Sequence, residues 1–200
     1  SQIISEDVNA GTDTIYLAPT ASLTFQTPDN VENVKIQDDF YLDPTMQVHL
    51  VGNALDNQLS GSNRLDGRGG NDTLIGIGDN TFVFGRGYGH DIVQTGTQLY
   101  AHTGLDQVEF MSDIAPVDLM VENHGRDLLL KVNGTTDQLT MESYFVSPST
   151  TVDQFVFADG TIWSLADIES RMTFVGSDGD DTFSGTFGDD TIRGLGGNDQ

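Results

Sequence analysis

Cysteine is absent from the 200 residues of this chain. Without thiols the chain can form neither disulfides nor thiolate metal sites, so an extracellular location would require some other cross-link. A hard cation is the remaining candidate, because it needs only carboxylate and carbonyl oxygens as ligands.

Basic residues are scarce: 8 lysines and arginines face 31 acidic residues, which gives a formal net charge of -23. Nucleic acid and anionic membrane surfaces would repel such a chain, so we expect neither as a partner. Its natural partners are cations. Self-repulsion opposes compaction, and 23 glycines raise the entropy lost when the backbone is ordered. We therefore expect folding to depend on a ligand.

Long apolar runs are also missing. None reaches the roughly 18 residues of a membrane-spanning helix, so we expect no membrane insertion. The chain starts at Ser1 without the basic and apolar segments of an export signal, and we interpret it as a piece of a longer protein. Hydrophobic residues make up 36% of the composition. This content permits a modest core in one elongated domain or two small ones.

The sequence does contain a nine-residue repeat near its C-terminus. The stretches GSDGDDTFS, GTFGDDTIR and GLGGNDQ follow one another from residue 176 and align without gaps. The sixth place of each unit is aspartate: Asp181, Asp190 and Asp199. An apolar residue, Phe183 or Ile192, occupies the eighth place. A short fixed period of this kind predicts a coiled β architecture.

A second, less regular block lies upstream. It reads GNALDNQLS, GSNRLD, GRGGNDTLI and GIGDNTFVF from residue 52, followed by GYGHDIV from residue 87. We assign the sixth place of these units to Asn57, Asn63, Asp72, Asn80 and Asp91. Because a neutral amide binds a hard cation more weakly than a carboxylate, the asparagines either form weaker sites or hydrogen-bond within the turn.

Between the two blocks the pattern changes. Glycine becomes rare, and alternating runs such as DQVEF, DLLLKVN and DQLTMESYF predict short strands. Asp159-Gly160 has the composition of a type I′ hairpin turn. Ser164 and Asp167 resemble the N-cap and acidic first turn of a short helix. The first fifty residues repeat the strand pattern more weakly, for example in DTIYL and VENVKI.

Catalytic motifs are missing from this chain. Its four histidines, at 49, 90, 102 and 124, occur singly, and neither H-E-x-x-H nor G-x-S-x-G is present, so we expect no enzyme activity. Alternating aromatic residues of the middle region predict core positions rather than a platform for sugars. They are Tyr144, Phe145, Phe155, Phe157 and Trp163.

The nonapeptide divides into a six-residue loop and a three-residue strand. Glycines allow the loop to turn its carbonyls toward one point, and calcium takes about six to eight oxygens at roughly 2.3–2.6 Å. One loop supplies too few, so stacked loops have to complete the shell together. A single copy would be an ordinary Asp-Gly turn, but three gapless copies favour calcium. We interpret the additional acids Asp178, Asp180 and Asp189 as solvated charges.

These motifs resemble the RTX, or haemolysin-type calcium-binding, family of secreted bacterial proteins. The resemblance is strongest at 67–74 and 176–199, and the stretch ending FADGTIWSLADI resembles the non-repeat domain that follows such repeats. It implies an all-β fold: a parallel β-roll with an intervening small β-rich domain that carries one short helix. The implied division is degenerate solenoid strands at 1–51, a first roll block at 52–97, a capping domain at 98–172 and a second block starting at 173.

The resemblance also implies the calcium ligands. One loop gives its second and fourth carbonyls and its sixth-place Asp, and the loop eighteen residues on gives its first and third carbonyls and its own Asp. The complete C-terminal site would then comprise Ser177, Gly179, Asp181, Gly194, Gly196 and Asp199. A second site there would begin with Thr186, Gly188 and Asp190.

The upstream site implied in the same way combines Arg68, Gly70 and Asp72 with the loop that carries Asp91. The two aspartates are nineteen residues apart instead of eighteen, which leaves open which carbonyls between Arg86 and Tyr88 take part. In all, we expect between one and four calcium ions.

We hypothesise that the chain is a monomeric, calcium-induced folding module of a type I-secreted protein at the bacterial surface or outside the cell. Its partners would be calcium ions and, through the parent protein, the type I secretion apparatus. The parent would be an adhesin in which this piece is an extender. The alternatives are a toxin or hydrolase with this piece as its non-catalytic module, and a middle domain that itself binds glycan or peptide.

Overall fold

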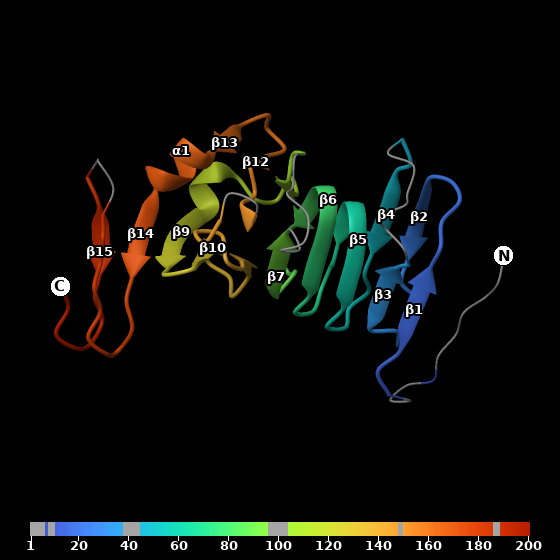
Figure 1. The fold of residues 1–200 in the computed structure, drawn as a ribbon, viewed down its shortest axis with the longest axis horizontal. Coiled ribbons are helices and arrows are strands. Elements are labelled where there is room, and N and C mark those ends of the chain that lie inside the picture. Colours follow the sequence, from blue (N-terminus) through green and yellow to red (C-terminus); the bar gives the residue numbers. More distant parts are fainter. Residues whose placement is uncertain (1–6, 8–10, 38–44, 96–103, 148–149, 186–188) are drawn as a thin grey trace.

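The computed structural model describes residues 7, 11–37, 45–95, 104–147, 150–185 and 189–200. The described residues form an elongated row of strands that runs from β1 (Thr14–Leu17) to β15 (Thr191–Arg193) (Figure 1). A short α-helix, α1 (Leu165–Glu169), and the 3-10 turn η2 (Pro116–Asp118) interrupt the strands of the described chain. The predicted all-β class with a single short helix is therefore confirmed.

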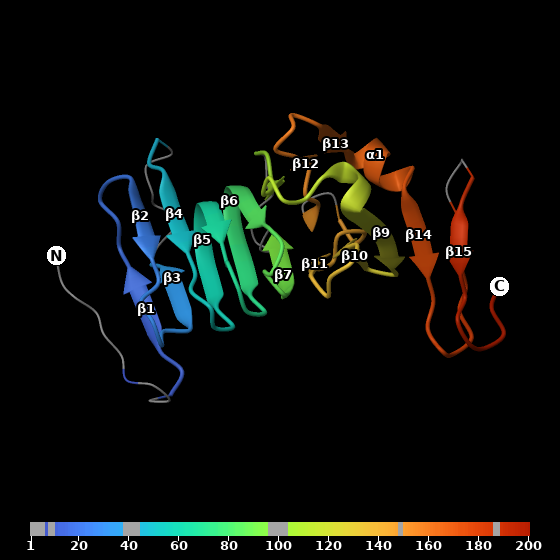
Figure 2. The same cartoon turned by 180° about the vertical axis from the view of Figure 1, so that it is seen from behind.

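The N-terminal half is a parallel roll with two ladders of strands, which Figure 2 shows from behind. The first ladder contains β1, β3 (Asn33–Ile36), β5 (Gln58–Asp66), β6 (Thr73–Phe84) and β7 (His90–Thr95). The second contains β2 (Leu23–Gln26), β4 (Val48–Val51), the later parts of β5 and β6, and β8 (Gln107–Phe110). Strands β5 and β6 belong to both ladders, and their register shifts between Gly61 and Asn63.

Apolar residues in register fill the space between the ladders. Val34, Leu59, Leu74 and Val93 align across β3, β5, β6 and β7, and each is at most 1% exposed. The second ladder contributes Leu50, Leu65, Phe82 and Val108, which are all fully buried. Because side chains alternate between the two faces of a strand, one apolar residue per short strand is sufficient to build this continuous core.

The middle segment, residues 104–172, continues both ladders. Strands β9 (Leu119–His124), β10 (Asp127–Val132) and β11 (Gln138–Met141) pair antiparallel, and β11 pairs in parallel with β7. Strand β12 (Gln154–Val156) pairs in parallel with β8 and antiparallel with β13 (Ile162–Ser164). Next, β14 (Met172–Val175) pairs in parallel with β9 and with β15. The pairings cross the boundaries expected near residues 51, 97 and 172, so the division into domains stays a prediction.

The sequence predicts two local features of the middle segment, a short helix and a type I′ hairpin turn. The helix is confirmed: Ser164 Oγ accepts a hydrogen bond from the Asp167 N–H, and the Asp167 carboxylate accepts one from the Ser164 N–H. The type I′ turn is wrong, because that turn needs positive φ at both central residues and only Gly160 has it, at 86°. The Gly160 N–H instead donates to the Phe157 carbonyl at 3.0 Å.

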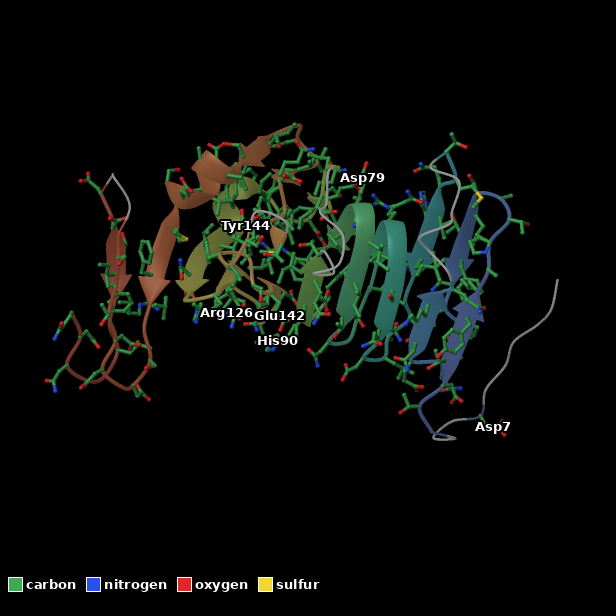
Figure 3. The ribbon with its side chains drawn as sticks, viewed as in Figure 1. Asp7, Asp79, His90, Arg126, Glu142 and Tyr144 are labelled. Atoms are coloured by element: carbon green, nitrogen blue, oxygen red, sulfur yellow. The ribbon has the colours of Figure 1, made fainter. Side chains whose placement is uncertain are left out.

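The aromatic residues behave as predicted with one exception. Tyr144, Phe155, Phe157 and Trp163 are buried, and the Phe157 ring stacks on Phe110 with centroids 4.8 Å apart. Figure 3 shows Tyr144 among the side chains that crowd the middle segment. The prediction was wrong for Phe145, which is 38% exposed. The strand has ended before this residue, and Tyr144 takes the inward position of the turn.

Candidate metal sites

Three six-residue loops stack along one edge of the roll: 52–57, 67–72 and 86–91, which we call the first loop stack. Each loop leads into a strand, and the backbones are joined by bonds from Thr73 N to Asn57 O and from Ile92 N to Asp72 O, both 2.8 Å. Their sixth-place residues are 15 and 19 positions apart, yet Thr73 and Ile92 remain aligned. The unequal spacing therefore changes the lengths of the segments between the loops, while each loop keeps six residues.

Side chains at the fifth and sixth places connect the loops of the first stack in opposite directions. At the sixth place, the Asn57 N–H donates to Asp72 Oδ1 at 2.7 Å, and the Asp72 N–H donates to Asp91 Oδ1 at 2.9 Å. At the fifth place, the Asn71 N–H donates back to Asp56 Oδ1 at 2.7 Å, and the His90 N–H donates to Asn71 Oδ1 at 3.0 Å. Each loop thereby fixes the conformation of its neighbours.

The second carboxylate oxygens of Asp72 and Asp91 have no hydrogen-bond partner, although these residues are only 1% and 0% exposed. Burial raises the pKa of Asp72 to about 7 and that of Asp91 to about 8, against an ordinary value of 3.8. A buried carboxylate oxygen without a donor requires a proton or a cation to compensate its lost hydration. These two residues therefore fit a hard cation such as calcium.

The first-place glycines are explained by the carboxylates of their own loops. A Cβ on Gly67 would lie 2.2 Å from Asp72 Oδ2, and one on Gly194 would lie 2.0 Å from Asp199 Oδ2. Real Cβ atoms do not approach so closely, so any side chain at the first place would displace the sixth-place carboxylate. The glycine and the aspartate of the repeat are thus a matched pair.

The C-terminal loop pair, 176–181 and 194–199, repeats the arrangement of the first loop stack. The Asp181 N–H donates to Asp199 Oδ1 at 3.2 Å, and the Asn198 N–H donates to Asp180 Oδ1 at 2.7 Å. The Gly196 N–H donates to the Ser177 carbonyl at 3.2 Å, as the Gly69 N–H does to Asn53 at 3.3 Å. These matches correct the interpretation of Asp180 as a solvated charge, because its side chain holds the neighbouring loop.

Among the described residues no three side chains of the types His, Cys, Asp and Glu gather into a metal cluster. Loops that supply one carboxylate each and otherwise carbonyls are consistent with that finding. A family model for the RTX calcium-binding nonapeptide repeat, in four copies, matches residues 59–90 and 173–200, and one for the haemolysin-type calcium binding protein related domain matches residues 127–167. The chain belongs to the RTX family. Its metal is therefore Ca²⁺. A comparison with the curated proteins found no significant match.

The structure brings together the two halves of the C-terminal site predicted for this RTX chain. Ser177, Gly179 and Asp181 lie in one loop of the pair, opposite Gly194, Gly196 and Asp199 in the other. Thr186 and Gly188 lie outside the described residues, whereas Asp190 is described and exposed. The assignment of individual residues as ligands stays a prediction.

The upstream RTX site likewise has its two loops in contact. The loop that carries Arg68, Gly70 and Asp72 is bonded to the loop from Arg86 to Asp91 through Asp72 and Asn71, and Tyr88 packs edge-on against Phe84 with ring centroids 5.8 Å apart. The Arg86 side chain points away from the loop stack into the middle segment. It donates to the carbonyls of Asp113 at 2.7 Å and Asn133 at 3.2 Å, and pairs with the Asp118 carboxylate at 3.2 Å.

Sequence reasoning missed Asp137, which belongs to the middle segment but serves the RTX loops. Its two carboxylate oxygens accept the N–H groups of Gly87 at 2.9 Å and Gly89 at 3.0 Å, and it is 6% exposed. Burial alone would raise the pKa of Asp137, yet these hydrogen bonds hold it below its ordinary value. The Gln138 N–H donates to the Gly89 carbonyl at 2.9 Å. Both sides of the loop backbone are therefore anchored.

The recurring dipeptide Asp-Gln could have indicated the role of Asp137 from the sequence of this RTX chain. Asp-Gln opens three runs of the middle segment, at 106–107, 137–138 and 153–154. On the opposite edge of the roll, the Asp106 N–H donates to Asp153 Oδ2 at 2.8 Å, and the Gln154 amide donates to Gln107 Oε1 at 2.7 Å. The aspartate thus joins neighbouring turns, and the glutamine after it starts the strand. In the repeats, the sixth-place residue and the residue after it do the same.

No helix of the described chain is long and apolar enough to cross a membrane.

Proposed function

We propose that this RTX segment is a calcium-induced folding module of a secreted protein, with ions bound between paired loops. The observation that carries the proposal is the burial of Asp72 and Asp91, each with one oxygen that lacks a hydrogen-bond donor. A chain with a formal charge of -23 cannot easily hold such groups in its interior unless they are neutralised.

The ligand sets of the proposed sites follow the paired loops. Calcium, when bound, supplies two positive charges and takes six to eight oxygens. In the first loop stack, the carboxylates of Asp72 and Asp91 would hold it with backbone carbonyls from 68–70 and 86–88. In the C-terminal pair, Asp181 and Asp199 would do the same with carbonyls of their loops. Since the same contacts order the loops and the core, metal binding and folding are one equilibrium.

Calcium concentration then decides where the protein folds. In a calcium-poor cytosol, repulsion among the carboxylates keeps the calcium-binding coils unfolded and the chain competent for type I export. Outside the cell, millimolar calcium stabilises the folded state by mass action. RTX repeats are typical of secreted bacterial proteins, which supports this order of events.

For the parent protein we favour an adhesin in which this segment is an extender. The row of strands carries the described chain from β1 at one end to β15 at the other, which suits a spacer (Figure 1). Strand β11 covers the edge of β7 and β12 covers the edge of β8, which supports a capping role of the middle segment for the first roll. Burial of Tyr144, Phe155 and Trp163 leaves these rings unavailable for stacking on a sugar.

Circular dichroism during a calcium titration tests the proposal. We expect most of the strand signal to appear cooperatively at up to millimolar calcium and to be lost in chelator. Asp181→Ala and Asp72→Ala should move the transition to higher calcium, while Asp178→Ala, an exposed neighbour in the same loop as Asp181, should not. A protein that is equally folded in chelator and in millimolar calcium would refute the proposal.

A further inference from the structure

The loop at residues 27–32 extends the first loop stack by one member. It leads into β3 as the 52–57 loop leads into β5, and the Gln58 N–H donates to the Glu32 carbonyl at 2.9 Å. The equivalent bonds further along the stack join Thr73 N to Asn57 O and Ile92 N to Asp72 O, both at 2.8 Å. The gap between loops 27–32 and 52–57, which we call the first gap, is therefore equivalent to the gap that contains Asp72 and Asp91.

Side-chain amides occupy the first gap. Asn53 Nδ2 donates to the carbonyls of both Pro28 and Val31 at 2.8 Å. Asn57 Nδ2 donates to the same Val31 carbonyl at 3.2 Å. From the other side, Gln26 Nε2 donates to the Gly52 carbonyl at 2.5 Å. Carbonyl oxygens of both loops are thus satisfied by N–H groups.

Asn57 and Asp72 occupy the same place in successive loops but differ in how their side chains are satisfied. Asn57 is 3% exposed; its Oδ1 accepts the Asn53 N–H at 2.8 Å, and its Nδ2 donates to Val31 O and Asn53 Oδ1. Asp72 Oδ2 has no hydrogen-bond partner. A carboxylate has only acceptors and must import positive charge, whereas an amide of the same shape brings its own donors.

We propose that the amides of Asn53 and Asn57 take the place of calcium in the first gap. The coils from β1 to β5 then hold together without the ion, and they form a metal-free template on which the calcium-dependent coils of β6 and β7 assemble. These two asparagines are specificity-determining residues, because they decide which gap takes calcium and which does not. The second part of this proposal rests on the proposed function; the amide substitution itself does not.

A preformed end changes how the roll assembles. A solenoid gains stability when each coil packs on the one before it, and starting the first coil is the costly step. If amides fix the first gap, then calcium has only to add coils to an existing edge. We therefore expect residual structure in the calcium-free protein to be confined to the N-terminal coils.

Backbone hydrogen exchange of the whole chain, in chelator and in millimolar calcium, tests the substitution. We expect the amide protons of β3 and of the start of β5 to be protected in both conditions. Asn53→Ala removes the donors to Pro28 and Val31, and should reduce that protection in chelator by about ten-fold or more. Asn133→Ala, which truncates an exposed amide of the middle segment, is the matched control and should leave it unchanged.

A second variant keeps the test decisive if Asn53→Ala does not fold. Asn57→Asp replaces donors by a carboxylate that faces the Val31 carbonyl, and should make the protection of β3 depend on calcium, with one more ion bound in isothermal titration calorimetry. Exchange of β3 in wild-type chelated protein at the unfolded rate would overturn the inference, as would unchanged protection in both variants. Protection of β6 and β7 in chelator would instead contradict the proposed function, and the variants would still decide the amide substitution.

Discussion

Asp137 accepts the backbone N–H of Gly89 at 3.0 Å, although the two residues lie 48 positions apart and in different parts of the fold. The same carboxylate accepts the Gly87 N–H, so one side chain of the middle segment holds the last loop of the first stack. Asp137→Ala should therefore weaken that calcium site and destabilise the calcium-loaded protein by about 2 kcal/mol, the order expected for charge-assisted bonds.

Calcium titrations and urea unfolding of the variant in millimolar calcium check this expectation. Asp159→Ala is the control, because Asp159 is an exposed acid that accepts from Thr161 within its own hairpin turn. If Asp137→Ala lowered stability equally in chelator and in calcium, without a change in calcium affinity, the residue would act on the fold alone.

The calcium-free protein should lose stability as the pH rises from about 4 to about 8. Burial raises the pKa of Asp72 to about 7 and that of Asp91 to about 8, so over this window the folded state keeps protons that the unfolded state, with ordinary values of 3.8, has released. Stability falls with pH wherever the folded state binds more protons. A group with a lowered pKa, such as Asp137, has the opposite effect on stability, but this effect is confined to pH values below about its ordinary pKa of 3.8.

Urea unfolding of chelated protein at pH 5 and pH 8 measures this dependence. Because protons can replace calcium at the buried carboxylates, we expect more strand signal and a higher midpoint at pH 5 than at pH 8, where the first loop stack is unfolded without calcium. The difference between the two pH values should be smaller in Asp91→Asn, which cannot ionise. A midpoint that increased from pH 5 to pH 8 in the wild type would contradict the assignment of buried, proton-holding carboxylates to the loop stack.

The fold was predictable where one repeat unit carries the whole signal. Leu59, Leu74 and Val93 each stand two residues after the sixth place of their loop, and their inward position follows from the repeat unit. The helix start was also local, since Ser164 and Asp167 satisfy each other within one turn. Such features depend on neighbours in sequence, and sequence patterns record them directly.

The remaining features depend on pairing between distant segments. The Asp-Gln dipeptide at Asp137 does not indicate which strand β11 pairs with, and the spacings of 15 and 19 residues hide the stacking of the loops. The role of Asn53 was equally hidden, because its partners Pro28 and Val31 belong to a loop that lacks the glycine pattern. Long-range register is set by the assembled core, so local composition does not specify it.

The fifth-place acid should contribute to the C-terminal pair. Asp180 Oδ1 accepts the Asn198 N–H at 2.7 Å, whereas Asp178 is exposed two residues earlier in the same loop. Asp180→Ala should lower the thermal midpoint of the calcium-loaded protein, by an amount that corresponds to about 1 kcal/mol for one exposed hydrogen bond. Differential scanning calorimetry of Asp180→Ala and of the control Asp178→Ala measures this difference. Equal thermal midpoints of the two variants would show that the fifth place has no structural role.

The pairing of first-place glycine with sixth-place aspartate is tested by two substitutions within one loop. A Cβ on Gly67 would lie 2.2 Å from Asp72 Oδ2, whereas a Cβ on Gly69 would meet its nearest atom, the Gly87 carbonyl oxygen, at 3.5 Å. Gly67→Ala should therefore displace the carboxylate and lower calcium affinity at least ten-fold, by about 1.4 kcal/mol or more, while Gly69→Ala should bind calcium as the wild type does. Calcium titration by isothermal calorimetry measures both. Equal affinities would mean that the first-place glycine serves only the backbone turn and not the carboxylate that it faces.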